Sequence, residues 1–153
     1  MSLNPLLELM FWRKRFYPRV PFARRMKLAE FREKVQLGYH IRDGEYFVHN
    51  EEDADRLSPM IFALIRDGGE ITVIEKLPEG STKADAMKLI TFTPDLPSDL
   101  VGFLLEVARA LANEGVPIFV ISSMSTDHLL VQTKYIEKVR RALKGAGLRE
   151  GPP

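Results

Sequence analysis

Apolar and polar positions in the second half of the chain follow a clear succession of strand and helix periods. In chain order, the pattern predicts a strand, a helix, two strands and a second helix, at residues 87–93, 100–112, 118–121, 128–131 and 133–145. Gly115 caps the end of the first helix, Thr133 caps the start of the second, and Leu148 is expected to begin a short closing strand. The order βαββα(β), with both helices on one sheet face, predicts an α+β fold, a ferredoxin-like two-layer sandwich.

The first half is built differently, from short apolar strands separated by turn residues. Its predicted elements are a short helix and four strands, at residues 26–34, 35–41, 46–49, 60–65 and 70–75. Asp43-Gly44 is a strong signal for a two-residue hairpin between the first two strands. The wholly apolar third strand is expected to be covered on both faces. This half resembles a shortened version of the second, and residues 76–86, with Pro78 and Gly80, form the internal boundary.

Charge is distributed unevenly, although the net charge is only +1. Residues 1–27 hold seven of the 22 basic residues and one of the 21 acidic ones, which leaves 15 basic and 20 acidic residues in the remainder. Such a basic N-terminal extension, residues 1–25, is compatible with a tail, an arm docked on a partner subunit or a start codon placed too early. A contact with nucleic acid or an anionic membrane is the alternative. Its apolar stretch is too short to span a bilayer.

The sequence lacks the motifs that carry most enzyme chemistry. Without cysteine there is no thiolate catalysis, disulfide or cysteine zinc site, and the absence fits a reducing cytoplasm. There is no nucleophile elbow, Walker loop, dinucleotide fingerprint or paired-histidine helix motif. We therefore predict a protein that is not an enzyme and uses no cofactor. An enzyme whose site forms only across subunits is the remaining catalytic alternative.

Histidines and acidic residues in the first half are weak candidates for a metal site. If Asp43-Gly44 closes a hairpin, His40 and His49 become diagonal neighbours about 7–8 Å apart, with Glu45 on the same face. No third ligand has diagnostic spacing, so solvated histidines are expected instead. The acidic run Glu51-Glu52-Asp53-Ala54-Asp55 is interpreted as a solvated edge, and no metal is predicted.

Two loops of the second half have the features of a ligand site. The connection 93–99 delivers the chain into a helix, whose free N–H groups attract anions such as a carboxylate unless Asp95, Ser98 or Asp99 caps them. Gly102, one turn into that helix, would allow a ligand or a neighbouring backbone to approach closely. The loop from Ser122 to Asp127 offers hydroxyl groups and one carboxylate, although these side chains could instead bond their own backbone.

Three stretches of the second half resemble one subfamily of ACT domains, the small prokaryotic tandem-ACT proteins related to animal cytosolic arginine sensors. They are Leu100-Val101-Gly102-Phe103-Leu104, the segment 111–123 that ends Ile-Ser-Ser, and Thr126-Asp127-His128-Leu129-Leu130-Val131. Ser123 and His128 stand where that subfamily usually has threonine and tyrosine. The resemblance implies an ACT domain at 87–150, preceded by a shortened ACT-like unit at 26–86.

The resemblance also implies a function: a non-catalytic regulatory protein that binds an amino acid or similar metabolite between ACT units. Carried over by position, the ligand-binding residues are Asp95, Leu96, Ser98, Gly102, Ser122, Ser123, Thr126 and Asp127. A cytoplasmic homodimer acting on a partner enzyme or regulator is expected. The alternative is a nucleic-acid-binding module that uses the basic N-terminal segment. The acidic remainder of the chain and the lack of an aromatic stacking pair argue against this alternative.

Overall fold

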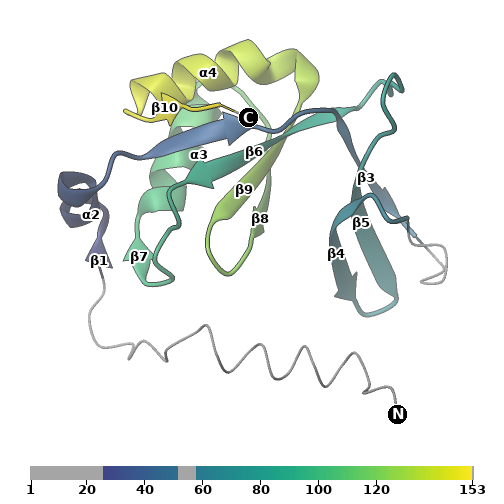
Figure 1. Ribbon diagram of the computed structural model, residues 1–153, viewed down its shortest axis with the longest axis horizontal. Helices are drawn as coiled ribbons and strands as arrows, with labels where there is room; N and C mark the ends of the chain where they lie inside the picture. Colours follow the sequence, from purple (N-terminus) through teal and green to yellow (C-terminus); the bar gives the residue numbers. More distant parts are fainter. Residues whose placement is uncertain (1–25, 52–57, 153) are drawn as a thin grey trace.

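The computed structural model describes residues 26–51 and 58–152 (Figure 1). Its elements are β1 (Met26–Lys27), α2 (Leu28–Lys34), β2 (Gly38–Ile41), β3 (Tyr46–Asn50), β4 (Ile61–Asp67), β5 (Glu70–Lys76), β6 (Met87–Thr93), β7 (Leu100–Val101), α3 (Phe103–Asn113), β8 (Phe119–Ser122), β9 (Asp127–Gln132), a 3-10 turn (Thr133–Tyr135), α4 (Ile136–Gly145) and β10 (Arg149–Glu150). The N-terminal extension 1–25 and most of the acidic run that begins at Glu51 lie outside the described residues.

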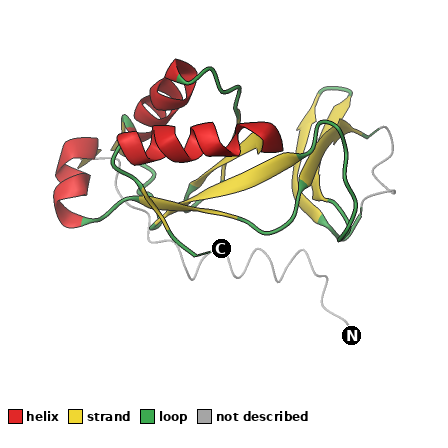
Figure 2. Ribbon diagram, turned by 90° about the horizontal axis from the view of Figure 1, so that it is seen from above, coloured by secondary structure: helices red, strands yellow, loops and turns green. Residues whose placement is uncertain are grey.

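The second half has the predicted order of strand, helix, two strands and helix, followed by the short strand β10 after the buried Leu148. Strand β6 lies in the centre, paired antiparallel to β9 on one side and to β2 on the other. Strand β8 continues the sheet beyond β9, and β10 continues it in parallel beyond β2. Figure 2 shows α3 and α4 on one side of the long strands. The α+β sandwich is therefore confirmed.

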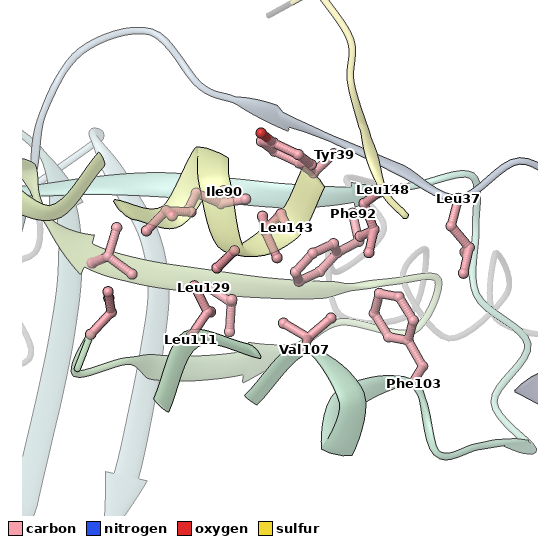
Figure 3. Close-up of a cluster of buried hydrophobic side chains, with 14 of the residues drawn as sticks. Leu37, Tyr39, Ile90, Phe92, Phe103, Val107, Leu111, Leu129, Leu143 and Leu148 are labelled. Atoms are coloured by element: carbon pink, nitrogen blue, oxygen red, sulfur yellow. The ribbon is translucent and has the colours of Figure 1, made fainter. Parts of the chain in front are cut away.

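The main core fills the space between the sheet and the two helices (Figure 3). Alternate residues of β6 and β9 face the helices, because side chains of a strand point to opposite faces. Ile90, Phe92 and Leu129 are at most 1% exposed, and the Phe92 ring meets the Phe103 ring edge-on with 4.9 Å between centroids. Helix α4 contributes Leu143, as its helical spacing predicts.

A second, smaller core lies on the opposite face of the sheet. Leu89 and Leu130, the intervening residues of β6 and β9, are buried there together with Tyr46 and Ile74 of the first half. Strands β3, β5 and β4 pair in that order, and β3 is joined to β6 through the pair Tyr46 and Met87. Both faces of β6 are thus covered, one by the helices and the other by the first half.

The hairpin predicted at Asp43-Gly44 is wrong. Position 38 pairs with Thr93 and position 40 with Thr91, so β2 lies against β6, and β3 pairs mainly with β5. Strands β2 and β3 follow one another along the same side of β6, and the turn at Gly44 (φ 86°) connects them without reversing the chain. Long-range pairing with the apolar β6 overrides the local turn signal, because it buries both faces of that strand.

Two further expectations are wrong in detail. Strand β4 is not covered on both faces, since Leu64 and Ile65 are 39% and 41% exposed. Thr133 does not cap α4: it begins the 3-10 turn, and its hydroxyl group donates to Glu45 and to the Ala86 carbonyl group. The left-handed Gly115 after α3 is as predicted.

Candidate ligand site

The two loops singled out from the sequence lie side by side and enclose a cavity of about 340 Å³, here called the first cavity. The Leu96 N–H group donates to the Ser125 carbonyl group at 2.6 Å, which ties the strand-to-helix connection to the Ser122–Asp127 loop. Of the predicted site residues, the lining includes Leu96, Ser98, Gly102, Ser122, Ser123, Thr126 and Asp127. Asp95 is not among them: it lines a neighbouring cavity on the other side of the Ser122–Asp127 loop.

The Ser122–Asp127 loop is held by its own hydrogen bonds. The Ser122 hydroxyl group donates to Asp127 Oδ1 at 2.6 Å, and the Ser123 hydroxyl group donates to the Thr126 carbonyl group at 3.0 Å. The Thr126 hydroxyl group reaches the Phe92 carbonyl group on β6 at 2.9 Å. Of these three side chains, only Ser123 bonds the backbone of the loop itself, as the alternative interpretation expected; Ser122 bonds a side chain, and Thr126 bonds the backbone of β6. A carboxylate has about four lone-pair sites, so Asp127 can still accept from a ligand.

Helix α3 starts later than the sequence predicted, and its start is open. Residues Leu100–Val101 form the short strand β7, paired in parallel with β1, and Gly102 is the N-terminal cap with a left-handed φ of 100°. Gly102 therefore turns the chain from strand into helix and does not lie one turn into it. No side chain in the part of the chain that the structure describes caps α3, so its first-turn N–H groups have no acceptor from Asp95, Ser98 or Asp99.

Several residues of the first cavity were missed by the sequence analysis, and most are apolar. They are Pro97, Leu100, Phe103, Leu104, Leu105 and Met124. Leu105 and Met124 are 63% and 65% exposed. The buried residues of α3 are Phe103, Val107 and Leu111, whereas Leu104 and Leu105 line the cavity without being buried.

Behind the loop, a chain of hydrogen bonds crosses three strands. Arg42 Nε donates to the Thr91 hydroxyl oxygen at 2.9 Å, which lies 3.0 Å from His128 Nδ1, and His128 Nε2 lies 3.3 Å from the Ser123 hydroxyl oxygen. Arginine can only donate, so we assign the Thr91 hydrogen to His128 Nδ1 and the histidine proton to Nε2. Ser123 of the first cavity is thereby connected to Arg42. No sequence pattern indicated these hydrogen bonds, because they depend on the pairing of β2 with β6.

Burial lowers the pKa of His128 below its usual 6.5, and the charge of Arg42 lowers that pKa further; Asp127 opposes them. Burial and Arg42 also lower the pKa of His40. Both rings therefore bind protons less readily in the folded protein than in the unfolded chain. We found no group of three metal-ligating side chains among the described residues, and His40 and His49 lie on different strand pairs, opposite Thr91 and Val73.

We predict that stability falls as pH drops through and below about 6.5. In this range the unfolded chain takes up protons that His128 and His40 of the folded protein resist, so the free energy of unfolding rises with pH. Urea denaturation between pH 5 and 8 measures the slope. In H128Q, which keeps a polar side chain between Thr91 and Ser123 but does not titrate, the slope is expected to be smaller. An unchanged slope would exclude His128 as its source.

The sandwich, with a cavity between its strand-to-helix connection and its central hairpin loop, is a small α+β module. Residues 84–145 match the family model of the ACT domain, and this part of the chain is an ACT domain. ACT domains are regulatory modules that bind small molecules, so the match indicates a regulatory role. Among curated proteins, none matches the chain.

Solved structures share the fold of most of the chain. Protein Atu0741 from Agrobacterium tumefaciens is 21% identical with a TM-score of 0.62, and the match covers 78% of this chain and 95% of that one. A Vibrio cholerae protein of unknown function, VC0802, described as a possible transport protein, is 24% identical with a TM-score of 0.62, covering 73% and 91%. Within the described residues, no helix has the length and apolar character needed to cross a bilayer.

Proposed function

We propose that this protein is a non-catalytic regulator that binds an amino acid in the first cavity. The observation that carries the proposal is that one side of this cavity suits a negatively charged group and the facing side a positively charged one. The uncapped start of α3, with Gly102, Phe103 and Leu104 on the lining, suits a carboxylate, because free N–H groups and the helix dipole attract anions. Asp127 on the facing loop suits an ammonium group.

The rim of the first cavity supports a site shared between two ACT units. Val101, Leu105 and Met124 are 54%, 63% and 65% exposed. Leu105 and Met124 line the cavity, and Val101 lies on β7 between the lining residues Leu100 and Gly102. A second copy seated on this rim would bury these side chains and close the cavity over the ligand. We therefore propose a homodimer, in which ligand binding stabilises one arrangement of the two chains.

Strand order supports the proposal that residues 26–86 are a shortened ACT-like unit. Strands β3, β5 and β4 pair in the same order as β6, β9 and β8 of the ACT domain, with the first strand of each set beside the third. This arrangement is in line with the tandem-ACT subfamily that the sequence resembles. The absence of cysteine supports a cytoplasmic location, where the liganded form would act on a partner enzyme or regulator.

Thermal denaturation in the presence of each of the twenty amino acids tests the proposal. A ligand at one hundred times its dissociation constant adds about 2.7 kcal/mol to the free energy of unfolding, which raises the melting temperature by several degrees. D127N removes the charge and keeps an acceptor for Ser122, so it is expected to abolish the shift. D67N, an equal change in the exposed β4–β5 turn, is the control. If no amino acid shifts the transition, or D127N responds like D67N, the proposal is wrong.

A further inference from the structure

A second cavity of about 520 Å³ lies behind the Ser122–Asp127 loop, between the sheet face opposite the helices and strand β4. Its floor is a row of three cross-strand neighbours, His40, Thr91 and His128, on β2, β6 and β9. Phe62 of β4 forms one wall, and its ring lies nearly perpendicular to the His128 ring, with 5.1 Å between centroids. This cavity is therefore built from both halves of the chain, whereas the first cavity lies within the second half.

Among the described residues, Arg42 is the only arginine or lysine that lines the second cavity. Its Nε atom is fixed by Thr91 at 2.9 Å, and its guanidinium carbon lies 5.3 Å from the centroid of the Phe62 ring. Among the described residues, no carboxylate lies within ion-pair distance of Arg42, and its terminal nitrogen atoms have no protein acceptor. A guanidinium group that is held in one orientation with two unused nitrogens can accept a planar oxyanion in bidentate geometry.

The surroundings of Arg42 favour an anion over a cation. The lining adds hydroxyl groups and two imidazole rings, and its single carboxylate among the described residues, Asp95, is exposed to solvent. Both ring nitrogens of His128 are already hydrogen-bonded, one to Thr91 and the other to Ser123. These bonds favour the neutral ring and hold it in place on the floor of the cavity. His40 has no hydrogen-bond partner among the described residues, so its ring can donate to a ligand. Solvent screens the charge of Asp95 more than that of half-buried Arg42.

We propose that the second cavity is a separate binding site for a small oxyanion, the carboxylate or phosphate group of a metabolite, held by Arg42 with His40 as a second donor. The site is distinct from the first cavity, although Ser122, Ser123 and Thr126 line both. It does not depend on the amino-acid site, because neither Arg42 nor His40 lines the first cavity.

Titration of the full chain with inorganic phosphate and, separately, with acetate tests this site at constant ionic strength, with chloride as the competing salt. The histidine ring signals in NMR spectra report binding, and those of His40 and His128 are expected to move with saturation for at least one of the two anions. The comparison also identifies which oxyanion the cavity prefers. Movement that does not saturate, or that chloride reproduces, would overturn the proposal.

Substitutions distinguish anion binding at this site from a general effect of surface charge. R42Q is expected to weaken anion binding at least about tenfold. The affinity of R42K is expected to lie between those of the original chain and R42Q, since lysine keeps the charge without the planar fork. R66Q, an equal loss of charge on exposed Arg66 of β4, is the control. T91V keeps the charge of Arg42 but removes the acceptor for its Nε atom, so weaker binding in T91V as well shows that orientation matters. Equal losses in R42Q and R66Q would refute the site.

Discussion

Truncation of Phe92 to alanine is expected to lower the free energy of unfolding by about 3–5 kcal/mol. Phe92 is 1% exposed in the middle strand of the sheet, where its ring packs edge-on against Phe103 of α3. The protein interior is close-packed, and β6 is held by β2 and β9 on both sides, so the backbone cannot move in to fill the space left by the ring. Urea denaturation followed by circular dichroism measures the loss.

The matched control is L105A. This change also removes a large apolar side chain, but one that faces away from the core. Leu105 is 63% exposed, so this change is expected to stay within about 0.5 kcal/mol of the original chain under conditions where it is monomeric. Comparable losses in F92A and L105A would show that the packing of α3 against β6 is not as described.

Local patterns were sufficient for the ACT domain. The apolar runs at 87–93 and 128–131 became β6 and β9, and the helical stripe around Val107 and Leu111 became the buried face of α3. Each of these signals lies within one element. The apolar runs are especially clear because both faces of these strands are buried in this fold. The same holds for the loop from Ser122 to Asp127, whose length and composition set it apart from a minimal turn.

Features that depend on long-range pairing were not predictable. Gly102 was placed inside a helix, because nothing in the local sequence shows that residues 100–101 pair with β1. Arg42 followed a strand that was expected to turn back at Asp43-Gly44, and only the alignment of β2 on β6 brings it to Thr91. The second cavity was missed for this reason, while the first, formed by two loops that flank neighbouring strands, was found.

The division of the chain near residue 86 stays a prediction, and separating the two halves is expected to have the largest effect of all. A fragment of residues 84–153 carries the whole ACT match but lacks β2, so the edge of β6 and the main core lose Leu37 and Tyr39, each 2% exposed in the full chain. It also lacks Tyr46 and Ile74, which leaves Leu89 and Leu130 uncovered on the other face.

Uncovering Leu89 and Leu130 alone costs about 1.5–3 kcal/mol each, and a domain is stable by only about 5–15 kcal/mol in total. With the contacts of Leu37 and Tyr39 also lost, the fragment is expected to be mostly unfolded, with poorly dispersed NMR signals and no cooperative urea transition. The full chain under the same conditions is the reference. A fragment that unfolds cooperatively near the midpoint of the full chain would show instead that β2 and the β3-β5-β4 strands add little to the ACT domain, and that residue 86 is a folding boundary as well as a change in sequence pattern.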